Sequence, residues 1–250
     1  MIAISHPGKI GDALYTLPTI RELSKKHNCK VDFVTSEYCR PIKEFMELQE
    51  PINECIIPEN YIIERYDMGI QPWLMPIDNS KYDAVYQLGF KQIPDKSLPG
   101  FIAETVGLNK EVGKNIFYEL HETVFERSDN YIAIAPRGET SYSPIFKGVI
   151  DWCESKNIEC RIIGGKGDYF NYGIDYTFLN FHDMAGLIST SKFYLGIMSA
   201  PLVIANGFDV PKIIPYNNNW DMRHIVQKSE SNYMFEPTLH QVIDIIGKYI

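Results

Sequence analysis

The sequence predicts an α/β protein with two parallel sheets, and three observations support this. Short apolar segments of strand length alternate with amphipathic segments of helix length, a pattern that implies right-handed crossovers between parallel strands. The pattern runs twice, on either side of a charged, weakly periodic stretch at 119–130. A glycine-containing loop joins the first strand to the first helix. We therefore expect two Rossmann-like domains, 1–126 and 127–250.

The first half opens with a buried strand at 1–5, the loop HPGKIGD and a helix at 12–27 whose apolar residues recur at helical spacing. The stretch 60–81 is rich in Tyr, Pro, Trp and Met without a period, and we expect an irregular loop there. The remaining expected elements are a strand at 31–35, a helical segment at 41–48, and strands at 54–57 and 82–88.

The second half repeats the alternation of strands and helices. A strand ending in GGKGD and a helix started by Pro201 are its clearest elements. The last helix is the one element that could pack back on the first domain. We expect strands at 131–135, 160–163, 176–179, 193–197 and 212–215, and helices at 147–156, 183–190, 201–207 and 238–249.

Composition excludes several classes of protein. The 250 residues carry a net charge of −8 with a pI near 5.3, which disfavours a protein that grips nucleic-acid backbone. Five widely spaced cysteines without a CxxC pair indicate reduced thiols, and no His or carboxylate pattern suggests a metal or other cofactor. The first residues lack the pattern of a signal peptide and no apolar run approaches a membrane span, so we expect a soluble, cytoplasmic protein.

The loop before the first helix is the first candidate site. Gly8 and Gly11 allow a tight turn, and exposed amides at a helix start favour an anion. Asp12 has two interpretations that can coexist, a helix N-cap and a general base for an acceptor hydroxyl. Lys9 and His6 share the loop and could neutralise charge on a leaving group. His6 could equally be a histidine satisfied within the turn.

Two segments in the first half follow a known pattern: Gly11-Asp12-Ala13-Leu14-Tyr15-Thr16-Leu17-Pro18 and, after it, Val31-Asp32-Phe33-Val34. Together they resemble the amino-terminal signature of the ADP-heptose:lipopolysaccharide heptosyltransferases, glycosyltransferase family nine. Tyr82-Asp83-Ala84-Val85 and the segment 185–193 resemble later family segments, although the chain is divergent and short for that family. The resemblance implies a GT-B fold with two domains facing a central cleft. It further implies the acceptor on the first domain, the donor on the second, an inverting transfer without a metal, and Asp12 as the base.

The donor side departs from the family pattern. Where the family has Asp-Ser/Thr-Gly-x-x-His after the strand at 193–197, this chain has Met198-Ser199-Ala200-Pro201, which keeps only the hydroxyl. A family lysine falls near Ser141. Arg137, close by, could supply the missing cation, since arginine suits bidentate phosphate contact; the alternative is a solvated surface cation.

Two further loops are candidates for the donor site. Gly164 and Gly165 begin a turn whose amides could touch a nucleotide, and Asp168 could bind ribose hydroxyls, although such a turn is often only structural. We expect this turn and the loop of Arg137 to face one crevice, because both leave strand carboxyl ends. A later polar run offers a sugar-binding set, or a plain loop with a buried indole; its candidate residues are Trp220, Asp221 and His224.

The leading hypothesis is therefore an inverting, metal-independent glycosyltransferase. It would use a nucleotide-diphosphate sugar and an acceptor hydroxyl, with a glycan or glycolipid as the expected acceptor and peripheral membrane contact through it. The altered segment at Met198 motivates a second hypothesis, a sugar-nucleotide or glycan-binding protein that has lost catalysis. A third is a sugar-nucleotide hydrolase or epimerase of the same shape.

Overall fold

The computed structural model describes residues 1–59, 74–90, 97–122, 124–126, 130–138, 143–217 and 231–250. The chain divides into two compact units, the first beginning at Met1 and ending at His121, the second beginning at Glu122. Each unit holds one sheet, and every described pair of neighbouring strands is parallel. This confirms the predicted fold class of an α/β protein with parallel sheets.

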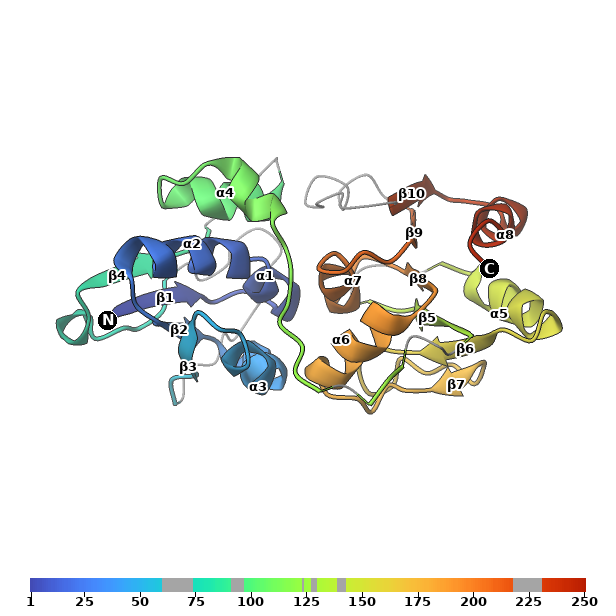
Figure 1. The fold of residues 1–250 in the computed structure, drawn as a ribbon, viewed down its shortest axis with the longest axis horizontal. Helices are drawn as coiled ribbons and strands as arrows, with labels where there is room; N and C mark the ends of the chain where they lie inside the picture. The colour runs from blue at the N-terminus through green and yellow to red at the C-terminus, as the bar shows by residue number, and fades with distance from the viewer. Residues whose placement is uncertain (60–73, 91–96, 123, 127–129, 139–142, 218–230) are drawn as a thin grey trace. The chain divides into compact units, whose positions relative to one another are not determined.

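The first sheet has the order β3-β2-β1-β4 (Figure 1). Strand β1 is fully buried, in keeping with residues that are apolar or small on both faces except for His6 at its end. The four strands are β1 (Ile2–His6), β2 (Val31–Thr35), β3 (Ile52–Ile56) and β4 (Ala84–Gln87). The predicted strand at 31–35 is confirmed to the residue.

The expected helix at 12–27 is two helices, α1 (Ile10–Leu14) and α2 (Leu17–His27). The break precedes Pro18, the second residue of α2, which has no N–H to donate to the Leu14 carbonyl four residues earlier but fits the first turn of a new helix. Asn28 then ends α2 in the left-handed conformation, with φ of 48°. The other helices of this unit are η1 (Glu37–Ile42), α3 (Lys43–Glu47), η2 (Asn79–Lys81), α4 (Leu98–Thr105) and η3 (Lys110–Lys114).

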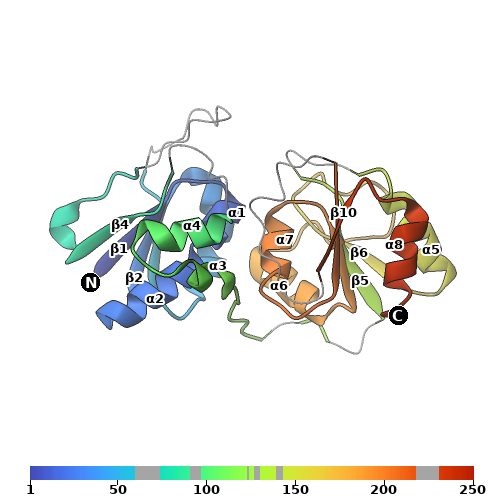
Figure 2. The same cartoon turned by 90° about the horizontal axis from the view of Figure 1, so that it is seen from above.

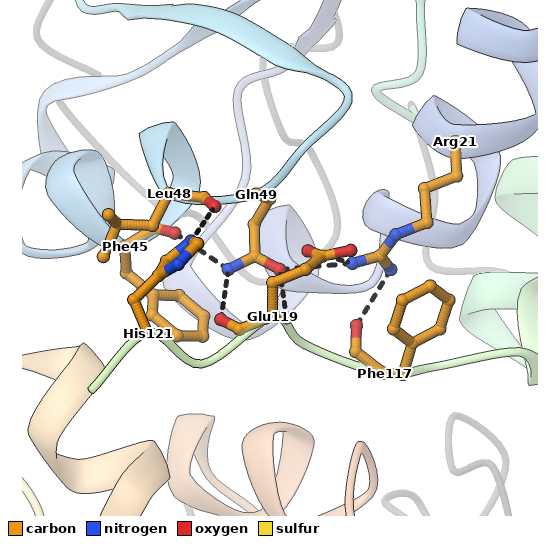
Figure 3. Close-up of polar contacts among 7 residues, drawn as sticks. All are labelled: Arg21, Phe45, Leu48, Gln49, Phe117, Glu119 and His121. Atoms are coloured by element: carbon orange, nitrogen blue, oxygen red, sulfur yellow. Dashed lines mark hydrogen bonds and ion pairs between the residues drawn. The ribbon is translucent and has the colours of Figure 1, made fainter. Parts of the chain in front are cut away.

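The segment that leaves the first unit is fastened to it by two buried side chains (Figure 3). Arg21, on α2, donates to the Phe117 carbonyl at 2.8 Å and to the Glu119 carboxylate at 2.8 Å. Its guanidinium also lies 3.6 Å from the centre of the Phe117 ring. Gln49 exchanges two hydrogen bonds with the backbone of Glu119. The last segment of the first unit is therefore bonded to the rest of that unit at Phe117 and Glu119.

The second sheet has the order β10-β9-β8-β5-β6-β7. This order, with connections on both sides of a central pair, is that of dinucleotide-binding Rossmann domains. The strands are β5 (Tyr131–Ala135), β6 (Glu159–Ile162), β7 (Ile174–Asp175), β8 (Phe193–Gly196), β9 (Lys212–Tyr216) and β10 (Ser231–Phe235). The predicted strand at 131–135 is confirmed, whereas the one predicted at 176–179 lies earlier, as β7.

Helices cover both faces of this sheet, α5 and α8 on one side and α6 and α7 on the other (Figures 1 and 2). Val242 and Ile246 of α8 complete a core with apolar side chains of α5, β5, β6, β8 and β9. The last helix thus uses its apolar face within the second unit. The helices are α5 (Phe146–Ser155), α6 (Phe181–Thr190), α7 (Ala200–Ala205) and α8 (Leu239–Ile246).

Candidate functional site

Strand order locates the candidate sites. In an open parallel sheet, ligands bind at the carboxyl ends of two neighbouring strands whose connections leave in opposite directions. These strands are β1 and β4 in the first unit, and β5 and β8 in the second. The segments that follow β1, β5 and β8 contain several of the residues singled out from the sequence, among them Asp12, Arg137 and Ser199.

In the first unit, Asp12 lies in the first turn of α1, directly after β1. Its carboxylate oxygen Oδ2 accepts a hydrogen bond from the backbone N–H of Lys9 at 3.3 Å. Lys9 is the N-cap residue, and Asp12 is the third residue of the helix, so the expectation that Asp12 is itself the N-cap is wrong. The carboxylate instead reaches back to the N-cap amide, as the acidic residue of a capping box does.

Burial sets the protonation of Asp12. The side chain is half-buried, and burial raises its pKa from 3.8 to about 6, while the Lys9 amide and ammonium oppose that rise. A carboxylate with a pKa near 6 is ionised at neutral pH and is more basic than an exposed aspartate. It can therefore accept a proton from a hydroxyl group that it contacts.

His6 ends β1 and is completely buried beneath the same loop. Its Nδ1 accepts from the Gly8 N–H at 2.9 Å, and its ring packs edge-on against Phe90 at 5.5 Å between ring centres. Burial lowers the pKa of His6 to about 3, so the ring is neutral. His6 Nδ1 is thus bonded within the turn, whereas the buried Nε2 has no hydrogen-bond partner among the described residues, and a neutral ring provides no cation for a leaving group.

Three side chains at and just after the carboxyl end of β2 hold this loop, and no sequence motif singles them out. Thr35 Oγ1 donates to the His6 carbonyl at 2.8 Å, and Cys39 Sγ donates to the Gly8 carbonyl at 3.3 Å. Ser36 Oγ lies 3.5 Å from the same Gly8 oxygen. All three are completely buried. Their position at the carboxyl end of a strand is only a weak signal in the sequence, because their role depends on β2 pairing with β1.

On the other side of β1, Gln87 fastens the segment after residue 73 to the sheet. Its amide donates to the Met75 carbonyl at 2.9 Å and accepts from the Met75 N–H at 3.0 Å. Gln87 also bonds to the hydroxyl of Ser5, its register partner on β1. Leu74, 46% exposed, is thereby held beside the carboxyl ends of β1 and β4.

In the second unit, the loops after β5, β6 and β8 meet. Arg137 is exposed and donates to the Gly167 carbonyl at 3.3 Å. A Cβ added to Gly138 would lie 3.0 Å from the Met198 carbonyl and 3.3 Å from Ser199 Cβ. The loop of Arg137 therefore contacts both the glycine turn and the segment with the altered family pattern.

The glycine turn is closed by its own aspartate. Asp168 Oδ2 accepts from the Gly165 N–H at 2.7 Å, and Gly164 has φ of 143°, which a side chain would strain. A Cβ on Gly164 would also lie 2.4 Å from Asp168 Oδ2. One carboxylate oxygen of Asp168 is thus already bonded within the turn that it stabilises.

Ser199 and Ala200 begin α7. Ser199 is the extended N-cap residue; its hydroxyl donates to the Ile197 carbonyl at 3.3 Å and makes no cap hydrogen bond. Lys147 is a second cation that follows β5 in the sequence, after Arg137. It pairs with Asp151 on the exposed side of α5 at 2.6 Å.

The remaining sequence candidates, Ser141, Trp220, Asp221 and His224, lie outside the described residues. Within the described ranges, no three His, Cys, Asp or Glu side chains gather as a metal site would require. No helix in the same ranges is long and apolar enough to cross a membrane.

The architecture defines a class: two Rossmann-like units on one chain, each with loops gathered at the carboxyl edge of a parallel sheet. No protein-family model and no curated protein matches the sequence. Solved structures do match it over both units.

The fold is that of the family-nine heptosyltransferases. The ADP-heptose lipopolysaccharide heptosyltransferase II of E. coli matches with a TM-score of 0.68 and 14% identity over 99% of this chain and 98% of that one. The E. coli heptosyltransferase WaaC with ADP matches with a TM-score of 0.67 and 13% identity over 100% of both chains. A family-nine glycosyltransferase from Veillonella parvula matches with a TM-score of 0.66 and 12% identity over 100% and 91%. The resemblance noted in the sequence is thus confirmed at the level of the fold.

Proposed function

We propose that this protein is an inverting, metal-independent glycosyltransferase that moves a sugar from a nucleotide-diphosphate sugar to a hydroxyl acceptor, with Asp12 as the general base. A glycan or glycolipid is the proposed acceptor, with peripheral membrane contact through it, and the cytoplasm the proposed location. The heptosyltransferase fold supports the donor class, since similar structures were solved with ADP and with ADP-2-deoxy-2-fluoro heptose.

One observation carries the proposal. Asp12 combines a position at the carboxyl end of β1, a hydrogen bond that orients its carboxylate, and a pKa raised to about 6 by burial. A group of this kind is needed to deprotonate an alcohol, because an acceptor hydroxyl is too weakly acidic to ionise alone at neutral pH.

In the proposed reaction, Asp12 takes the proton of the acceptor hydroxyl as its oxygen bonds to the anomeric carbon. The bond from that carbon to the diphosphate oxygen breaks on the opposite face, which inverts the anomeric configuration. Negative charge then develops on the nucleoside diphosphate. Lys9, with the backbone amides around Gly11, and Arg137 are the groups proposed to stabilise it.

The donor is proposed to bind at the carboxyl ends of β5, β6 and β8. The backbone of Gly164 and Gly165 would pack against the nucleoside, while the Gly165 N–H stays bonded to Asp168. The start of α7, Ser199 and Ala200, would face the phosphates. Asp168 would reach ribose hydroxyls while it keeps the turn closed, because its two oxygens can serve different partners.

The test begins with calorimetric titration of ADP-, UDP-, GDP- and CDP-sugars, followed by transfer assays with the donor that binds. Asp12→Asn should bind that donor normally and transfer sugar about 10²–10⁴-fold more slowly. The matched control is Asp244→Asn, an exposed carboxylate on α8, which should transfer at the wild-type rate. Full activity of Asp12→Asn would remove Asp12 from the mechanism.

A second candidate is a sugar-nucleotide-binding protein without catalysis. It is favoured by the segment from Met198 to Pro201, which has neither an acidic nor a basic side chain where the resembling family contacts the donor phosphates. It predicts donor binding without turnover for any hydroxyl acceptor offered. Release of free sugar at a rate that no acceptor changes would instead identify a hydrolase, and a changed sugar still bound to nucleotide an epimerase.

A further inference from the structure

One peptide group links Cys39 to Asp12. The carbonyl of Gly8 accepts from Cys39 Sγ at 3.3 Å and, at the longer distance of 3.5 Å, from Ser36 Oγ. The N–H on the other side of the same peptide bond, which belongs to Lys9, donates to Asp12 Oδ2 at 3.3 Å. The two ends of a peptide are conjugated, so a donor at the carbonyl makes the N–H a stronger donor. The thiol and the carboxylate are therefore the ends of one chain of hydrogen bonds.

The surrounding contacts keep this peptide from rotating. The next N–H along the chain toward β1, that of Gly8, is occupied by His6 Nδ1, and the His6 carbonyl is held by Thr35. A Cβ on Gly8 would lie 2.4 Å from His6 Cε1 and 2.9 Å from Asp12 Cβ. The His6 ring and the Asp12 side chain thus pack directly against Gly8 and leave no space for a side chain at this position.

Cys39 is suited to act as the donor of this chain. Its side chain is completely buried, so water does not compete for the Gly8 carbonyl. Burial also raises the pKa of Cys39 to about 11, which keeps the sulfur protonated at neutral pH. A thiolate could not donate, and a protonated thiol can.

We infer that Cys39 is a positioning residue for the catalytic base, acting on Asp12 through the Gly8–Lys9 peptide. The inference rests on the proposed function, because it bears on catalysis only if Asp12 accepts the proton. The titratable groups that face Asp12 are the Lys9 ammonium on its own loop, the His6 ring on β1 and the Cys39 thiol on η1. Without the thiol, the Lys9 N–H becomes a weaker donor and the carboxylate binds its proton more tightly.

The test is the titration of Asp12 followed by its ¹³Cγ resonance in full-length protein labelled at aspartate, with the signal assigned through Asp12→Asn. Cys39→Ala should raise the titration midpoint by about half a pH unit. Cys39→Ser keeps a donor and should stay close to the wild-type midpoint. If Cys39→Ala does not fold, Cys39→Val, another side chain without a donor, carries the same expectation.

Cys55→Ala is the matched control, because Cys55 is also completely buried in the first unit and the hydrogen bonds described for it join its backbone to Lys43 and Glu47, outside the loop. It should leave the midpoint unchanged. An unshifted midpoint in Cys39→Ala, or an equal shift in Cys55→Ala, overturns the inference. Sugar transfer by Asp12→Asn at the wild-type rate would overturn the proposed function instead, and the titration result would still stand.

Discussion

At the scale of single residues, Asp12 shows how a reactive group costs stability. Its pKa in the folded protein, about 6, lies above the ordinary value of 3.8. The ionised form is therefore less favourable in the folded chain than in the unfolded one. This penalty is complete above about pH 6, shrinks as the pH falls from 6 toward 3.8, and is absent below 3.8, where the carboxyl group is protonated in both states.

Replacing Asp12 by asparagine should consequently stabilise the protein while it abolishes the base. At pH 7.5 we expect Asp12→Asn to raise the free energy of unfolding by about 1–2 kcal/mol, a figure reduced for the partial solvent exposure of the side chain. Urea unfolding at pH 7.5 and pH 4.5 measures this. The gain should shrink at the lower pH, and an equal gain at both would show that ionisation is not its source.

The sequence predicted the residues of the candidate site unevenly. Asp12 and the glycine loop could be found because a strand, a loop with glycines and a helix form a local pattern. Thr35 and Cys39 could not, because a hydroxyl or thiol after a strand has no distinctive spacing. Their role depends on β2 lying beside β1, which is a fact of the sheet.

At the scale of elements, the loop after β1 tolerates no side chain at Gly8. Gly8→Ala should displace His6 or Asp12, because the new Cβ would come within 3 Å of both. We expect a loss of about 1–3 kcal/mol in unfolding free energy and a sugar-transfer rate at least about tenfold lower. The measurements are urea unfolding and the transfer assay.

Gly247→Ala provides the control for this substitution. Gly247 is exposed, has a helical φ of −61° and accepts a Cβ without a contact under 3.3 Å. It should leave both stability and transfer near their wild-type values. Equal effects at the two glycines would contradict the steric explanation.

Arg21 holds the last segment of the first unit against α2. Arg21→Met keeps its packing on Phe117 and removes its bonds to Phe117 and Glu119. We expect a loss of about 2–3 kcal/mol, because a partly buried carboxylate and a carbonyl lose their partner. Limited proteolysis should cut the segment near Glu119 faster. Arg40→Met, which breaks an exposed pair with Glu37, should change neither result.

Elements in the sheet interiors were more predictable than those at the margins. The buried strand β5 is a continuous apolar run and β2 is apolar or β-branched except at Asp32, and the bounds of both agree with the expectation. The edge strand β10, SNYMF, is too polar to stand out, and β7 has only two exposed residues. Helix α4 begins LPGF, and its proline and glycine conceal its period.

At the scale of the whole molecule, the repeated α/β pattern was enough to predict the architecture. The strand order of the second sheet could not be predicted, because it depends on long-range pairing. Identities of 12–14% with proteins of the same fold show how little side-chain identity that architecture requires. The activity consequently has to be argued from the loops.

The proposed metal independence of the transfer concerns the whole protein and can be measured directly. With a working donor and acceptor, excess EDTA should leave the transfer rate unchanged, because the proposed leaving-group charge is met by Lys9, Arg137 and backbone amides. Added Mg²⁺ or Mn²⁺ should not raise the rate. A loss with EDTA that Mg²⁺ restores would contradict this part of the proposal.

The parallel order of the two sheets also has a consequence for folding. The strand pair beside each candidate site is joined across a long stretch of chain: Ser5 meets Gln87, 82 residues away, and β5 meets β8 across roughly sixty residues. Closing such loops costs more entropy than pairing strands that are near in sequence. The strand contacts that create the two carboxyl edges are thus expected to form late, after much of each unit has already been assembled around them.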